Sequence, residues 1–72
     1  MSVNIIINGK KENVEKGMSV LALLSSRSIR PEVVTVELNE EILEKPKYNE
    51  TILKEQDKIE FVYYMGGGGY AF

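Results

Sequence analysis

The chain has 72 residues, of which 43% are hydrophobic and 28% are charged, and its formal net charge at pH 7 is -2. This length suits one compact domain with a modest core, and the composition is that of a folded globular protein. The slight negative charge excludes an extended basic surface for nucleic acid, and the absence of Cys and His excludes disulfides, thiolate nucleophiles and the common zinc sites.

The chain opens with the pattern of a β-hairpin. Residues 3–7 form a β-branched run, and the Asn8-Gly9 pair that follows favours a two-residue turn with positive φ angles. The return strand, residues 10–14, is polar, which predicts an edge strand. Its water-facing side chains are expected to be Lys10, Lys11 and Glu12.

One amphipathic helix is expected after the hairpin. Ser19 is the predicted N-cap, and the apolar residues behind it recur at helical spacing. These residues are Val20, Leu21, Leu23 and Leu24. We expect the helix to end near Ser28, because Pro31 disfavours helical dihedrals at Arg30.

The second half of the chain reads as short extended pieces. Residues 33–38 alternate apolar and polar side chains, which predicts a strand buried on one face, and residues 39–40 turn the chain. We expect a brief strand at residues 42–43, an irregular connection at 46–49 and another extended piece at 51–53.

The last regular element is a strand over residues 58–64, with Ile59, Phe61 and Tyr63 on one face. The order of elements predicts an α+β fold in which a mixed four- to five-stranded sheet is covered by one main helix. The expected core consists of Ile5, Ile7, Val20, Leu23, Leu24, Val34, Val36, Leu38, Leu53, Ile59 and Phe61.

Four consecutive glycines, residues 66–69, follow this strand. Because glycine loses much backbone entropy on ordering, we divide the chain into a domain of residues 1–65 and a flexible tail of residues 66–72. A phosphate-binding loop is excluded, since no helix has room to follow the run. The glycines form either a frayed terminus or a thread for a narrow channel in a partner, about 13 Å long when extended.

The rest of the chain favours neither catalysis nor metal binding. Ser25, Ser26 and Ser28 have no base to activate them, so we interpret them as solvated helix-end residues. A group of glutamates lacks the spacing of a calcium loop and favours a solvated face or docking to a basic partner. These are Glu37, Glu40, Glu41 and Glu44.

The C-terminal half of the chain resembles a known protein family. The strand Asp57-Lys58-Ile59-Glu60-Phe61, followed by Gly66-Gly67-Gly68, resembles the ThiS-type (ThiS/MoaD-like) sulfur carriers of thiamine biosynthesis. The hairpin, the helix start and the chain length fit the same family. The resemblance implies a β-grasp, ubiquitin-like fold and a carrier protein that is acted on by enzymes rather than being one.

The resemblance also implies the chemistry. An E1-like adenylyltransferase uses ATP and magnesium to adenylate the terminal glycine carboxylate, and sulfur from a persulfide donor displaces AMP to give a thiocarboxylate. A sulfur-accepting biosynthetic enzyme then takes the sulfur. The carrier itself binds no cofactor.

The sequence departs from the family pattern after the glycines, because Tyr70-Ala71-Phe72 follow them. This departure resembles relatives that are trimmed by a metal-dependent JAMM-type peptidase. The resemblance implies that the carboxyl group converted to a thiocarboxylate belongs to Gly67 or Gly68. Gly69 is another possible mature end, and Gly66 belongs to the flexible tail.

Two further expectations concern partners. Family members dock through an apolar patch on the sheet face opposite the helix, which suggests Val62 or Tyr64, although cross-strand packing would also explain both residues. The rival functions are a protein modifier joined to lysines through the same glycine, and a β-grasp interaction module with an unreactive end.

The expected location is the cytoplasm. No apolar run approaches the ~20 residues needed to span a bilayer, and no signal-peptide pattern opens the chain. We therefore expect no membrane partner.

Overall fold

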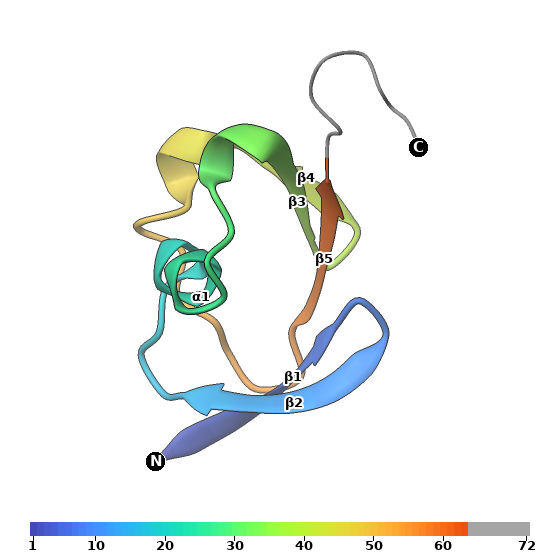
Figure 1. Ribbon diagram of the computed structural model, residues 1–72. Helices are drawn as coiled ribbons and strands as arrows, with labels where there is room; N and C mark the ends of the chain where they lie inside the picture. The colour runs from blue at the N-terminus through green and yellow to red at the C-terminus, as the bar shows by residue number, and fades with distance from the viewer. Residues whose placement is uncertain (64–72) are drawn as a thin grey trace.

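The computed structural model describes residues 1–63 as a twisted sheet packed on one helix (Figure 1). The strands are β1 (Ser2–Ile7), β2 (Lys10–Glu15), β3 (Val34–Leu38), β4 (Glu41–Leu43) and β5 (Lys58–Tyr63). The helix is α1 (Val20–Ser26), and two short 3-10 helices are η1 (Pro31–Val33) and η2 (Lys45–Lys47). Within residues 1–63, no helix is long and apolar enough to cross a membrane.

The sheet has five strands in the order β2-β1-β5-β3-β4. β5 runs parallel to β1 and antiparallel to β3, while the other neighbours are antiparallel hairpins. In Figure 1 the sheet curves round α1, which covers one face. The predicted mixed sheet with one main helix is confirmed, and so is the edge position of β2.

Two hairpin turns share one backbone geometry. Asn8 and Gly9 have φ angles of 48° and 85°, and Asn39 and Glu40 have φ angles of 52° and 73°. Positive φ at both central residues is the type I′ turn, whose twist matches that of the flanking strands. The turn predicted at Asn8-Gly9 is therefore confirmed, and the second turn places a glutamate where glycine is usually preferred.

The helix begins as predicted and ends earlier. The Ser19 hydroxyl accepts a hydrogen bond from the Ala22 N–H at 3.0 Å. The helical residues stop at Ser26, because Ser28 adopts a φ of 58° and its N–H turns back to the Ser25 carbonyl. The Ile29 N–H bonds the Leu24 carbonyl at 2.9 Å, which completes a Schellman motif. This local cap, rather than Pro31, ends the helix.

The core is close to the predicted one. The predicted core residues are buried except Leu38, which is half-buried near the β3 turn. Val14 and Tyr48 are buried in addition. Val14 pairs with Val3 on the inner face of the edge strand, and Tyr48 follows η2 within the segment that was expected to be irregular.

Other boundaries also differ in detail. Glu12 was expected to face water but pairs with Arg27, which ties the edge strand to the end of α1. Val33 belongs to η1 rather than to β3. The extended piece at 51–53 is present as a bridge between Ile52 and Ser19.

Candidate functional site

The site predicted from sequence begins where β5 ends. Gly66, Gly67, Gly68, Gly69 and Tyr64 lie outside the described residues. The structure therefore describes the support of the tail: β5, which lies between β1 and β3 and ends at Tyr63.

On one side, Asn8 holds β5. The parallel ladder runs from the Ile6 N–H to the Asp57 carbonyl at 2.9 Å and from the Asn8 N–H to the Ile59 carbonyl at 3.0 Å. β1 stops at this point, and the Asn8 side-chain oxygen accepts the next bond, from the Phe61 N–H at 2.8 Å. The Asn8 amide thus replaces the backbone carbonyl that a longer β1 would supply.

On the other side, Asn39 holds the start of β5. The Asn39 N–H donates to the Lys58 carbonyl at 2.7 Å, and the Lys58 N–H donates to the Asn39 Oδ1 at 2.9 Å. The Asn39 side-chain amide also donates to the Asp57 carboxylate at 3.0 Å. Both asparagines occupy the first central position of a type I′ turn, so each hairpin turn also fixes the strand that carries the tail.

Val62 lies where the sequence pattern placed it. Its neighbours Ile59 and Phe61 are buried under α1, whereas Val62 is 48% exposed on the opposite, outer face of the sheet and is paired with Thr35. Tyr63 is 50% exposed although it shares the inner side with Phe61, because it is the last residue of the strand.

Ile42 was not singled out from the sequence, yet it is the most exposed large apolar residue on the outer face, at 69%. It pairs with Glu37, while the next residue, Leu43, pairs with the buried Val36. The alternation within β4 was the available signal, since one of two adjacent apolar residues in a strand must face outward. We define the outer apolar patch as Ile42 and Val62.

Carboxylates lie beside this patch. Glu37 and Glu60 are direct cross-strand partners, and Lys58 Nζ lies 3.9 Å from a Glu40 oxygen. These four side chains line a hollow of about 110 Å³. Like charges directly opposite each other destabilise a sheet, so the Glu37–Glu60 pair costs the free protein stability.

The glutamate group predicted from sequence is thereby divided. Glu37 and Glu40 contribute to the hollow, but Glu41 and Glu44 belong to the β4 edge and its continuation. Among residues 1–63, no group of three His, Cys, Asp or Glu residues is arranged to hold a metal ion.

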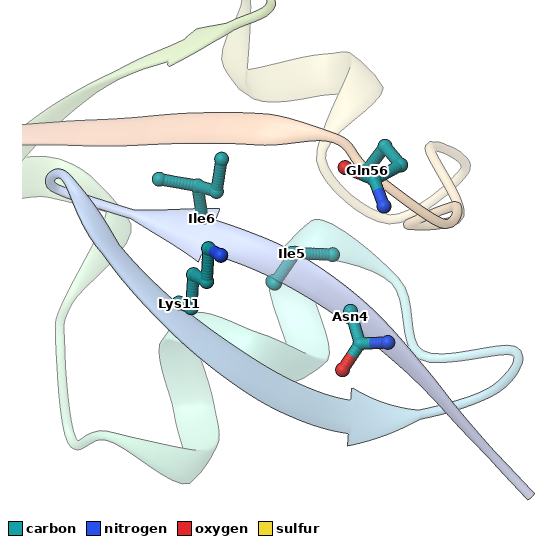
Figure 2. Close-up of a pocket in the computed structure, with 5 residues that line it drawn as sticks. All are labelled: Asn4, Ile5, Ile6, Lys11 and Gln56. Carbon is teal, nitrogen blue, oxygen red and sulfur yellow. The ribbon is translucent and has the colours of Figure 1, made fainter.

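A second hollow of the outer face lies over β1 and β2. Figure 2 shows the residues that line it, Asn4, Ile5, Ile6, Lys11 and Gln56. The hollow has a volume of about 180 Å³. Ile6 and Lys11 are cross-strand partners, and the polar ends are two amides and one ammonium.

Asn4 also organises the turn before β5. Its N–H donates to Glu55 Oε1 at 2.9 Å and its side-chain amide donates to Oε2 at 3.0 Å. These two hydrogen bonds, the backbone one first, lower the pKa of Glu55. The Gln56 N–H returns a bond to the Asn4 carbonyl at 2.7 Å, which fixes the entry of the chain into β5.

Two of the serines predicted at the helix end contribute to the end of α1. The Ser26 hydroxyl donates to the Leu23 carbonyl at 2.8 Å, and Ser28 occupies the left-handed cap position. Their interpretation as helix-end residues agrees with this geometry.

Comparisons with known proteins agree with this architecture. The ThiS family model matches residues 3–68. The sulfur carrier protein ThiS of Bacillus subtilis is 38% identical over 63 residues, covering 86% of this chain and 96% of that protein. A thiazole synthase of Magnetococcus marinus is 36% identical over 66 residues, but the chain spans only 20% of that protein.

Among solved structures, the crystal structure of a thiamine biosynthesis protein (ThiS) from Geobacter metallireducens superposes with a TM-score of 0.78. The two sequences are 42% identical, and the match covers 92% of this chain and 100% of the solved chain. The mixed sheet with its single helix is therefore the β-grasp fold of the ThiS proteins. From these matches we conclude that the chain belongs to the ThiS family.

Proposed function

We propose that this chain is a sulfur carrier for thiamine biosynthesis and that its reactive group is the carboxyl of a C-terminal glycine. The observation that carries the proposal is the extent of the family match, which runs through the domain and on to Gly68 in the glycine run. The similarity to a sulfur carrier protein over 96% of that protein's length supports the same function.

The proposed chemistry needs a leaving group that a carboxylate lacks. An E1-like enzyme supplies it: the glycine carboxylate attacks the α-phosphorus of ATP, pyrophosphate leaves, and magnesium balances the phosphate charge. A persulfide sulfur then attacks the acyl carbon and AMP departs. A thiol reduces the remaining S–S bond, which leaves the thiocarboxylate.

A maturation step must come first. Tyr70-Ala71-Phe72 follow the glycines, so every glycine carbonyl of the full chain is in a peptide bond. We propose that a JAMM-type peptidase removes these residues. Gly68 is the favoured mature end because the family match stops there, and Gly67 and Gly69 are the neighbouring candidates. In this scheme residues 66–68 work as a tail on a domain of residues 1–65.

The outer apolar patch is the proposed docking face for the activating enzyme. Ile42 and Val62 are exposed on the sheet face away from α1, and they flank the Glu37–Glu60 pair. Two apolar side chains with carboxylates between them suit a partner that presents apolar and basic side chains. Docking there would relieve the repulsion between the two carboxylates.

The proposed sulfur acceptor is a thiazole synthase. The support is the 36% identity between this chain and a segment of two proteins with that name. In those proteins the similar segment is part of the same polypeptide, which fits a carrier that delivers sulfur to that enzyme.

Intact-protein mass spectrometry tests the function. A chain of residues 1–68 is incubated with native lysate, ATP, magnesium and a sulfide source, and the expected product has one oxygen replaced by sulfur. The reaction without ATP and a chain with Gly68→Pro serve as controls. The full chain in the same lysate should lose Tyr70 to Phe72.

Other outcomes identify the rival functions. If the chain became joined to lysines of other proteins and no thioacid formed, its function would be that of a protein modifier and not of a sulfur carrier. A chain of residues 1–68 that stays unmodified in every condition would leave only an interaction module.

A further inference from the structure

An apolar groove lies at the β4 edge of the sheet, close to where β5 ends. It has a volume of about 370 Å³ and lies between β4 and η2. Its apolar walls come from Val34, Ile42, Leu43, Pro46 and Tyr48. Ile42 is 69% exposed, so an apolar occupant would cover a side chain that is now largely open to water.

The register of the sheet places this groove beside the end of β5. Val34 and Thr35, which line the groove, pair with Tyr63 and Val62, the last two residues of the described strand. Paired residues in neighbouring antiparallel strands are about 5 Å apart. A chain that leaves Tyr63 therefore starts next to the groove wall.

We propose that the Tyr70-Ala71-Phe72 extension folds back and that the rings of Tyr70 and Phe72 occupy this groove. The proposal rests on the function proposed above, because it assigns a role to the residues that maturation would remove. Tyr70 follows Tyr63 by seven residues and reaches at most about 25 Å. The four glycines before it tolerate the positive φ angles that a reversal of the chain requires.

The other large apolar groove of residues 1–63 lies much farther from the end of β5. It is lined by Met1, Val3, Ile52 and Leu53 among others, at the end of the sheet where the N-terminus lies (Figure 1). Since Ile6 pairs with Lys58, Val3 is level with residue 55, about 26 Å from Tyr63 at the strand rise. Tyr70 would reach it only when almost fully extended, whereas the β4 groove begins beside Tyr63.

The docked extension would hide part of the outer apolar patch. Ile42 belongs both to the groove and to the patch. An activating enzyme that needs Ile42 would then meet a covered surface until the extension is cut off. The extension would thus keep the immature carrier from occupying the enzyme unproductively.

Methyl NMR on the purified chain tests the docking. Spectra of the 72-residue chain and of residues 1–68 are compared, and the methyl resonances of Ile42 and Leu43 should shift between them while those of Ile52 stay in place. A Tyr70→Ser, Phe72→Ser chain should give the spectrum of residues 1–68 at these methyls. An Ala71→Ser chain, the matched control, should resemble the full chain.

Carboxypeptidase digestion gives an independent readout. If the tail is docked in about nine chains out of ten, the protease can reach Phe72 in only the remaining one. Ile42→Ser should release the tail, so this chain should lose Phe72 about fivefold to tenfold faster than the unchanged chain. Ile52→Ser places the same change in the distant groove and should leave the rate unaltered.

Two results would overturn the docking: unchanged Ile42 and Leu43 methyls upon truncation, or shifts at Ile52 instead. Neither measurement uses the activating enzyme, so their failure leaves the sulfur carrier standing. Conversely, if residues 1–68 never form a thiocarboxylate, the carrier fails whatever the methyls show.

Discussion

The side-chain oxygen of Asn8 accepts a hydrogen bond from the backbone N–H of Phe61 at 2.8 Å, across 53 positions of the chain. β1 has already ended at Ile7 when this bond forms. The side chain of a turn residue thus continues the ladder that holds the strand leading to the tail.

Replacing Asn8 by Ala should destabilise the protein by about 2 kcal/mol. The substitution leaves the half-buried Phe61 N–H without its acceptor and puts a Cβ-bearing residue without a compensating side chain at a φ of 48°. Chemical denaturation followed by circular dichroism measures the loss.

Two further substitutions separate the two causes. Asn8→Asp keeps an acceptor oxygen and tolerates positive φ, so it should cost less than about 1 kcal/mol. Asn8→Gly keeps only the conformational freedom. Because glycine also escapes the Cβ penalty at this φ, an Asn8→Gly protein more stable than the unchanged one by about 1 kcal/mol would mean that the hydrogen bond contributes nothing.

Ser28→Gly should stabilise the protein by about 1 kcal/mol. Ser28 has a φ of 58° at the cap of α1, a conformation in which glycine has no Cβ penalty. Ser26→Gly is the matched control, because Ser26 is helical and glycine there should cost about 0.5 to 1 kcal/mol. Thermal melting of both variants should therefore move in opposite directions.

Glu60→Gln should raise stability and slow docking. Removing one charge of the Glu37–Glu60 pair should stabilise the sheet by about 0.5 kcal/mol, with a smaller gain at high salt. The same change should lower the rate of association with the activating enzyme severalfold at low salt. Glu15→Gln, on the far edge strand, should leave this rate unchanged, and equal rates for both variants would argue against the docking face.

Val62→Ser and Ile42→Ser in residues 1–68 should each lower kcat/KM for thiocarboxylate formation about fivefold to tenfold, as expected for apolar contacts at the centre of an interface. Both side chains are exposed in the free protein, so the melting temperature should change little. Ile52→Ser provides the comparison at the opposite end of the sheet. An undiminished rate in both outer-face variants would place the docking surface elsewhere.

Acid should weaken the turn before β5 through Glu55. Its hydrogen bonds from Asn4 lower the pKa of this carboxyl in the folded state. A lowered folded pKa contributes stability that is complete above the unfolded value, about 4.3, and is lost as the pH falls through the folded value.

Glu55→Gln removes that contribution. The stability difference between the unchanged protein and this variant should be largest near pH 6 and should shrink as the pH falls below about 4.3. Urea titrations at several pH values measure it. A difference that stays constant down to pH 2 would contradict the assigned hydrogen bonds.

The sequence predicted the fold well where the signal is local. The Asn8-Gly9 turn, the Ser19 cap and the alternation through β5 each depend on a few adjacent residues. Burial of Tyr48 was not predictable in the same way, because it lies in an aperiodic segment and becomes buried only through packing against distant elements.

The candidate site divides along the same line. Periodicity placed Val62 on the outer face, and the same rule applied to β4 would have found Ile42. Glu37 and Glu60 are 23 positions apart in sequence, and predicting that they face each other requires the register between β3 and β5. Composition and spacing do not provide this register. The glycines were found by composition alone, and their role stays a prediction.

The position of β5 between two neighbours also has a mechanical consequence. An enzyme that grips the chain beyond Tyr63 pulls along a strand whose hydrogen bonds to β3, to β1 and to Asn8 lie across the direction of the force. Such a load strains these bonds together in shear, whereas an edge strand such as β2 would peel away one pair at a time. The domain is therefore built to stay folded under a pull applied beyond Tyr63.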